Sequence, residues 1–169
     1  MSNLSVDYLQ NVSGSINVPV RDLKTRVIQY YQQEHTGGDW NPNNTYNWIP
    51  GGFRDFTPKR SDTRIRFIFR AAMAWRNNAH AISHMIFFAN NVQYYTWSES
   101  GTHVENGKTW EFEVPSWGTT EARIGIQMRS YSVNNNTVRM HTTYYWRPSG
   151  TGLIPQNSRG HLMIEEILY

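Results

Sequence analysis

Two glutamates stand two positions apart in a segment that is predicted to be a strand. Glu111 and Glu113 alternate with apolar residues, so a period of two places both carboxylates on one face. Paired carboxylates are the groups that a glycosidase uses as acid and base. An exposed polar face explains the same pattern, because no third polar group and no pocket that would raise a pKa accompanies them. We therefore expect no catalytic residue and no enzymatic activity.

Two histidines, His80 and His84, carry imidazoles that could bind a metal ion. On a strand they share a face but stand roughly 13 Å apart, which is too far for one ion. In a helix the two rings would meet. The apolar run at 81–88 is predicted to be a strand, and no phosphate-binding loop or zinc-protease motif is present. We therefore expect no metal and no cofactor.

Three aromatic residues, Trp40, Tyr46 and Trp48, lie in or beside a loop at 35–44 that is rich in Gly, Pro and Asn. Exposed rings in such a loop could contact a glycan or another protein. Alternatively, the rings fold back over the edge of the domain or pack into a neighbouring subunit. We favour this second interpretation, because so many aromatic residues are more often buried in protein contacts.

The composition points to one domain that is stable without cross-links. The chain has 169 residues, no cysteine and a formal net charge of +3. No apolar run reaches membrane-spanning length, so we expect no membrane insertion. Residues 1–7 lack the features of a secretory signal, which predicts synthesis in a cytoplasm. The densest basic stretch, 59–67, contains Asp62 and no nucleic-acid-binding motif, so we expect no nucleic-acid partner.

Alternating apolar and polar residues predict an all-β chain. Turn residues separate the strands, and no segment shows a convincing helical period. This pattern favours an antiparallel β-sandwich that resembles a jelly roll. The predicted strands are 24–33, 53–57, 64–75, 81–88, 92–97, 110–114, 123–129, 138–147 and 161–168.

Turn chemistry predicts where neighbouring strands are joined. Asn90-Asn91 is predicted to close a tight turn, and Asn106-Gly107 is the strongest two-residue hairpin signal in the chain. Pro50-Gly51-Gly52 predicts a further turn. The asparagines at 134–136 predict a hairpin between the strands at 123–129 and 138–147. Residues 148–159, rich in Gly, Pro and Ser, predict a loop.

The first 22 residues differ from the rest of the chain. They are polar with short apolar pairs, contain the break Ser13-Gly14-Ser15, and end near Pro19. We predict an extended N-terminal arm at 1–22, which could include a short strand, and a β-sandwich domain at 23–169.

Three stretches of the sequence resemble segments of structural proteins of tailed phages, particularly those that infect cyanobacteria. The first is Val6-Asp7-Tyr8-Leu9-Gln10-Asn11-Val12-Ser13-Gly14, near the N-terminus. The second is Phe56-Thr57-Pro58-Lys59-Arg60-Ser61-Asp62-Thr63-Arg64-Ile65, and the third is His161-Leu162-Met163-Ile164-Glu165-Glu166-Ile167.

The resemblance implies a component of the virion: a compact fibre, a knob, or a head or tail decoration built on a trimeric β-sandwich. It implies that the N-terminal arm attaches the subunit to a capsid or tail protein, through residues such as Val6, Tyr8, Leu9, Gln10 and Asn11. The expected partners are then two further copies of the chain, other virion proteins and a host surface glycan. A receptor-binding or carbohydrate-binding sandwich that uses aromatic loop residues is the alternative function.

Arginines on the predicted strand faces suggest where subunits meet. Arg64, Arg66 and Arg70 share one face of the strand at 64–75, and further arginines lie in the segment 123–147. Guanidinium groups form bidentate pairs and stack on aromatic rings, which suits them to interfaces. A solvated face remains an alternative for any one of them.

Overall fold

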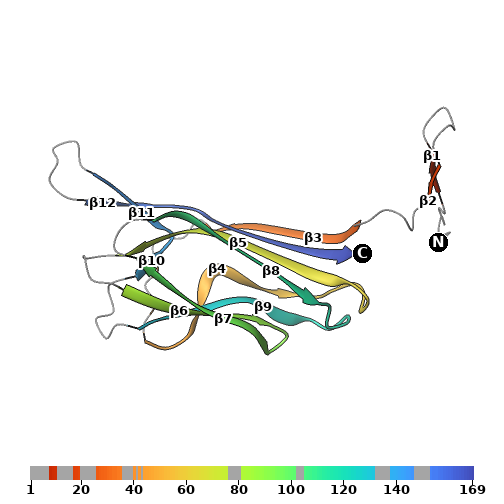
Figure 1. Cartoon of the computed structure of the whole chain (residues 1–169), viewed down its shortest axis with the longest axis horizontal. Coiled ribbons are helices and arrows are strands. Elements are labelled where there is room, and N and C mark those ends of the chain that lie inside the picture. The colour runs from red at the N-terminus through yellow and green to blue at the C-terminus, as the bar shows by residue number, and fades with distance from the viewer. Residues whose placement is uncertain are drawn as a thin grey trace.

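The protein is an all-β sandwich, as the alternating sequence predicts. The computed structural model describes residues 8–10, 17–19, 26–35, 40, 42, 44–75, 81–101, 105–131, 138–146 and 153–169. These residues form thirteen strands and no helix. Two antiparallel sheets lie one above the other (Figure 1). Within the described part of the chain, no helix is long and apolar enough to span a membrane.

The first sheet is built around β5 (Arg64–Trp75). On one side β5 pairs with β13 (Gly160–Leu168), which in turn pairs with β3 (Arg26–His35). On its other side β5 pairs with β8 (Glu105–Pro115). A short strand, β10 (Val138–Met140), pairs with the C-terminal end of β5. All of these pairings are antiparallel, and the order is β3-β13-β5-β8.

The second sheet has four antiparallel strands in the order β4-β9-β6-β7. They are β4 (Asn47–Phe56), β9 (Ala122–Ser130), β6 (Ala81–Ala89) and β7 (Val92–Gly101). The tight turn between β6 and β7 is confirmed, since Asn90 and Asn91 have φ values of 50° and 61°. Positive φ at two consecutive residues is what a two-residue hairpin turn of type I′ requires, and asparagine tolerates it.

Two further pairs of strands lie outside these sheets. β1 (Tyr8–Gln10) pairs with β2 (Asn17–Pro19) inside the segment that is predicted to be an arm. β11 (Thr142–Trp146) pairs with β12 (Leu153–Asn157). The segment 148–159, which we predicted to be a loop, therefore contains a strand. Pro155 is tolerated in this strand because proline can occupy an edge strand without interrupting the ladder.

The core lies between the sheets and takes residues from both. On β9, the alternating apolar residues Ile124, Ile126 and Met128 are fully buried. Phe67 of the first sheet packs against Phe87 of the second, with ring centroids 5.1 Å apart. Burying an aromatic or branched aliphatic side chain contributes roughly 1.5–3 kcal/mol, so this shared interior holds the two sheets together.

The hairpin predicted between 123–129 and 138–147 is wrong. β9 lies in the second sheet and pairs with β4 and β6, whereas β10 pairs with β5 in the first sheet. The predicted strand at 138–147 is itself divided at His141, whose φ of 61° ends β10 and lets β11 pair elsewhere. The turn residues 134–136 lie outside the described residues.

Two other predicted turns are irregularities inside strands. Asn106-Gly107 belongs to β8, where the pairing with β5 shifts register and Gly107 has a φ of 46°. A β-bulge of the G1 type places a glycine in the left-handed region, as many hairpin turns do, so the dipeptide alone does not separate them. Likewise, Pro50-Gly51-Gly52 lies within β4, where the register against β9 shifts.

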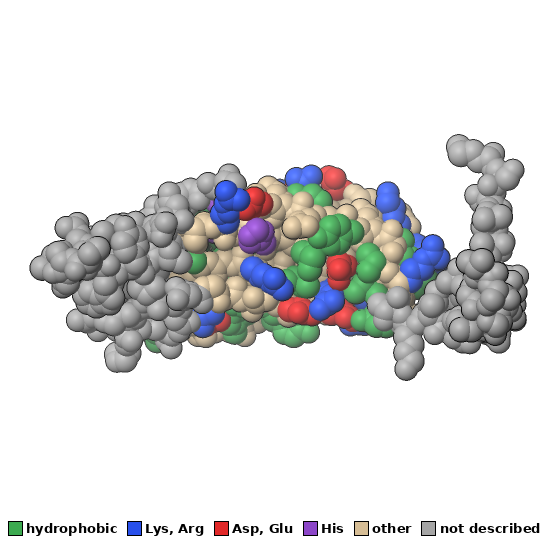
Figure 2. All heavy atoms as spheres, turned by 90° about the horizontal axis from the view of Figure 1, so that it is seen from above, with side chains coloured by type: hydrophobic (Ala, Val, Ile, Leu, Met, Phe, Trp, Pro, Cys, Tyr) green, Lys and Arg blue, Asp and Glu red, His purple; other side chains and the backbone are tan. Residues whose placement is uncertain are grey.

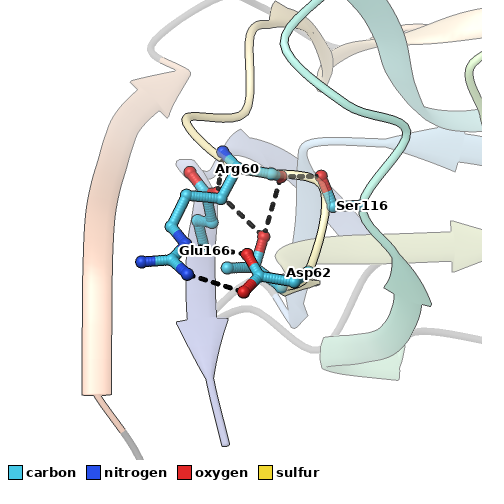
Figure 3. Close-up of polar contacts among 5 residues, drawn as sticks. Arg60, Asp62, Ser116 and Glu166 are labelled. Carbon is cyan, nitrogen blue, oxygen red and sulfur yellow. Dashed lines mark hydrogen bonds and ion pairs between the residues drawn. The ribbon is translucent and has the colours of Figure 1, made fainter.

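A buried carboxylate joins the end of the last strand to the loop that precedes β5 (Figure 3). Glu166 is fully buried and accepts hydrogen bonds from the backbone N–H groups of Lys59 and Arg60 at 2.7 and 2.9 Å. The hydroxyl of Thr63 donates a third bond at 2.8 Å. Ser116 donates a further bond to the carbonyl of Arg60, so the β8–β9 connection is held in the same place. The three hydrogen bonds to Glu166 compensate the cost of burying its carboxylate.

Candidate functional site

Aromatic rings cluster on the outer surface of the second sheet, away from the core. Trp48 and Phe53 come from β4 and Phe88 comes from β6. The indole of Trp48 lies 5.5 Å from the ring of Phe53 and 6.0 Å from that of Phe88, which it meets edge to face at 63°. All three side chains are half-buried, so part of each ring is open to solvent.

A glycine of the middle strand separates these rings. In the ladder, Gly125 of β9 lies opposite Phe53 on one side and Phe88 on the other. A Cβ at Gly125 would stand 2.4 Å from the Cβ of Phe53 and 2.6 Å from the carbonyl oxygen of Gly52. The backbone of β4 therefore approaches β9 so closely that a side chain has no room there.

An ion pair borders the aromatic cluster. The guanidinium of Arg123 lies 5.0 Å from the ring centroid of Phe53 and 5.8 Å from that of Trp48. It also donates two hydrogen bonds to the carboxylate of Asp55, at 2.7 and 2.9 Å. These bonds hold the pKa of Asp55 below its usual value. The pair stays ionised at neutral pH, and its two charges compensate one another.

A hollow of about 130 Å³ lies beside the cluster. Its lining residues are Trp48, Phe88, Asn91, Arg123 and Gln127. Gln127 lies opposite Trp48 in the β4–β9 ladder, and Asn91 comes from the exposed turn between β6 and β7. The hollow thus combines two aromatic walls with two side-chain amides and one guanidinium.

A wider hollow of about 460 Å³ is lined by Asp55, the partner of Arg123 in the ion pair. Asp55 and Phe53 line this second hollow, together with Gln33, Gly51, Arg54 and Glu121. The guanidinium of Arg54 lies 4.8 Å from the ring centroid of Tyr31 of β3. The two hollows share no lining residue, but the bonds between Asp55 and Arg123 connect their walls.

The structure separates the three aromatic residues that the sequence analysis grouped together. Trp40 pairs with Met140 through two backbone hydrogen bonds and packs against the core. The guanidinium of Arg129 lies over Tyr46, 4.8 Å from the centroid of its ring. Trp48 alone takes part in the cluster described above. For Trp40, the interpretation in which the ring folds back onto the domain is the one that the structure supports.

The two glutamates of the predicted strand lie on the outer face of the first sheet. Glu111 pairs with Arg66 at 2.6 Å, and Glu113 pairs with Arg64. The hydroxyl of Tyr169 also donates a hydrogen bond to Glu113, which lowers the pKa of that carboxyl. A lowered pKa opposes the role of a general acid, which needs a raised one. Arg64 and Arg66 of β5 are thus engaged within the chain.

The histidines are dispersed over the fold. His80 lies outside the described residues, and the Nδ1 atom of His84 is hydrogen-bonded to the hydroxyl of Ser98 at 2.9 Å. His35 and His141 meet at one end of the sandwich, with ring centroids 4.4 Å apart. Among the described residues, no group of three or more His, Cys, Asp or Glu side chains is placed to hold a metal ion.

Of the residues predicted to attach the arm, Tyr8, Leu9 and Gln10 form β1, while Val6 and Asn11 lie outside the described residues.

The aromatic cluster and its hollow, which the sequence analysis missed, consist of residues from three different strands and a turn. Only the alternation within each strand was visible in the sequence. In the structure, Arg123 and Gln127 lie on the outer face of the second sheet and line the smaller hollow.

Figure 2 shows a different surface, the outer face of the first sheet, where charges of both signs and hydrophobic side chains are intermixed. Arg66 lies between Glu111 and Glu165 there, and Arg159 pairs with Glu34 at 2.8 Å. Exposed ion pairs of this kind contribute little to stability. Among the described residues, this face therefore carries both positive and negative side chains.

Comparisons with known proteins provide little further information. No protein-family model matches the chain, and no curated protein matches it. Among solved structures, the chain is similar to the crystal structure of the infectious bursal disease virus VP2 subviral particle, with 6% sequence identity and a TM-score of 0.34. The match covers 94% of this chain and 45% of the other chain. A likeness at this level supports no argument about function.

Proposed function

We propose that the protein is a non-enzymatic structural subunit of a bacteriophage virion, folded as a jelly roll and assembled as a homotrimer. In this proposal it forms a compact fibre, a knob or a head or tail decoration, and its N-terminal arm attaches it to a capsid or tail protein. The order of the strands is the observation that carries the proposal.

Eight strands of the two sheets pair as they would in one long antiparallel ribbon that is rolled up. The first strand, β3, pairs with the last, β13, and the second, β4, pairs with the seventh, β9. In the same way β5 pairs with β8, and β6 pairs with β7. Successive pairs of the ribbon alternate between the two sheets. This winding supports the proposed jelly roll, an architecture that recurs in viral capsid proteins and lectins.

Two edge strands carry exposed apolar residues that would suit contacts between copies. On β3, Val27 and Tyr30 are 49% and 51% exposed. On β7, at the edge of the other sheet, Val92, Tyr94 and Tyr95 are 50%, 38% and 48% exposed. Long edge strands with exposed apolar side chains tend to pair with other chains unless something covers them. Neighbouring subunits would supply that cover.

Light scattering coupled to size-exclusion chromatography tests the assembly. We expect a mass three times the 19.8 kDa of the chain. Replacing an edge residue, as in Tyr30→Lys, should dissociate the assembly if β3 lies in the contact, because it would bury a charge there. Glu121→Lys, which changes an exposed residue of the β8–β9 connection, is the control. A folded wild-type monomer at all concentrations would contradict the trimer.

Localisation in particles tests the virion role. Antibody labelling of intact phage particles that carry this gene should place the protein on the head or the tail. Deleting residues 1–22 should abolish incorporation and leave the sandwich folded, as measured by circular dichroism. Absence of the protein from purified particles would contradict the proposed function, whatever its oligomeric state.

A further inference from the structure

The aromatic hollow on the second sheet has the features of a site for a sugar ring. Trp48 and Phe88 meet edge to face, so their rings form two walls at an angle of 63°. The face of an aromatic ring carries partial negative charge, which attracts weakly positive C–H groups. One face of a pyranose ring presents such C–H groups, and the hydroxyl groups at its rim need hydrogen-bond partners.

The polar groups of the hollow match those hydroxyl groups. Gln127 and Asn91 each carry an amide that both donates and accepts hydrogen bonds. A sugar hydroxyl also donates and accepts, so it can pair with an amide in either direction. A purely aromatic cleft would suit any apolar ligand, whereas amides beside aromatic walls favour a ligand that has both kinds of surface.

The charge at the site selects a neutral ligand. Arg123 is the cation in the lining, and both of its hydrogen bonds to Asp55 commit its charge to that carboxylate. An acidic sugar would have to compete with Asp55 for the guanidinium, and binding it would leave a carboxylate without its partner. The site therefore favours neutral hexoses over sialic or uronic acids.

The dimensions indicate how much of a glycan is held. A volume of about 130 Å³ is below the roughly 300 Å³ of the smallest drug-sized ligand pockets, so the hollow holds one ring. The hollow of about 460 Å³ that Asp55 lines has room for the sugars that follow. Its polar lining suits the hydroxyl groups of a chain that continues toward Glu121 and Gln33.

We propose that this surface binds a neutral glycan, with one pyranose ring packed against the angle formed by Trp48 and Phe88 and bonded to Asn91 and Gln127. The inference goes beyond the proposed function, because the contacts between subunits would involve the exposed apolar residues of β3 and β7 and not this face. Either proposal can therefore fail while the other stands. Trp48 is one of the three aromatic residues that the sequence analysis named. Its partners in this site come from β6, β9 and the β6–β7 turn.

Nuclear magnetic resonance of the full-length, ¹⁵N-labelled protein is the direct test. The probes are the methyl glycosides of glucose, galactose and mannose, with the methyl glycoside of sialic acid as the acidic comparison. We expect at least one neutral glycoside to shift the side-chain amide signals of Asn91 and Gln127 and the indole N–H signal of Trp48. No shift with any neutral glycoside, or shifts with the acidic sugar alone, would overturn the proposal.

Variants identify the residues that bind. Trp48→Ala should weaken binding about tenfold, the upper range for a stacked aromatic contact. Asn91→Gly removes the amide but suits the φ of 61°, so it should preserve the turn and still reduce the affinity several-fold. Tyr30→Ala, an exposed tyrosine of the other sheet, is the matched control and should bind normally. Unchanged affinity in Trp48→Ala would overturn the proposal, as would a second copy of the chain covering the hollow in the assembled protein.

Discussion

Lowering the pH should destabilise the fold through the imidazole of His141. This side chain is fully buried, and its Nε2–H group donates a hydrogen bond to the carbonyl oxygen of Pro50 at 2.8 Å. Its Nδ1 atom is buried and has no hydrogen-bond partner among the described residues. Protonation would therefore place an uncompensated charge in the interior, next to the ring of His35.

Burial lowers the pKa of His141 from 6.5 to about 4 in the folded protein. Between these values the unfolded chain binds a proton that the folded chain does not. The free energy of unfolding is therefore unaffected above pH 6.5 and falls as the pH drops from there toward 4. Between neutral pH and pH 5 the loss amounts to about 2 kcal/mol, which lowers the Tm by roughly 5 °C. Burial also lowers the pKa of His35, which adds a loss of the same sign.

Urea denaturation at a series of pH values measures this loss. The test variant is His141→Asn, because asparagine does not titrate and tolerates the φ of 61°. It should be less stable than the wild type at neutral pH, but its stability should depend less on pH. His161→Gln changes an exposed histidine and should keep the full pH dependence. An equal loss between neutral pH and pH 5 in His141→Asn and in the wild type would refute this reasoning.

Two further predictions concern stability, and both can be measured by thermal or chemical denaturation. Glu166→Gln should destabilise the protein by about 2 kcal/mol, because the NH₂ group that replaces one carboxylate oxygen cannot accept the backbone hydrogen bond made to that oxygen. An unchanged midpoint would show that these bonds contribute nothing. Gly125→Ala should cost about 3 kcal/mol, since its Cβ would collide with backbone atoms of β4, whereas Gly107→Ala, with open space around it, should cost about 1 kcal/mol. Equal effects of the two substitutions would contradict the close approach of β4 to β9.

Most strands could be predicted from the sequence because alternation is a local property. The strand at 64–75 has the predicted bounds, and its inward residues Ile65, Phe67 and Phe69 are buried. The apolar run at 81–88 and the turn at Asn90-Asn91 are confirmed as well. Each of these predictions depends only on residues that are neighbours along the chain.

The partners of the strands could not be predicted in the same way. The segments around the asparagines at 134–136 look like two strands of one hairpin, yet they belong to different sheets. Gly107 has the positive φ that was expected of a hairpin turn, but it lies within β8, where the pairing with β5 shifts register. A residue type can indicate the local backbone conformation, but it does not show which distant strand lies alongside.

The candidate site was visible only in part. The sequence pointed to Trp48 through its position beside a loop, but it gave no reason to associate Trp48 with Phe88 or Arg123. Those residues are far apart along the chain and meet because β4, β9 and β6 are adjacent in the sheet. The missing side chain at Gly125, between Phe53 and Phe88, could be interpreted only once the register was known.

The sequence by itself determined that the chain is all-β, and it determined which side of many strands faces the interior. A two-residue period assigns apolar side chains to one face before any partner is chosen. The tertiary structure alone decided the order of the strands, the two sheets and the surface on which Trp48 and Arg123 meet. Those outcomes depend on contacts between distant segments, whose combined packing selects one arrangement among many that the local pattern permits.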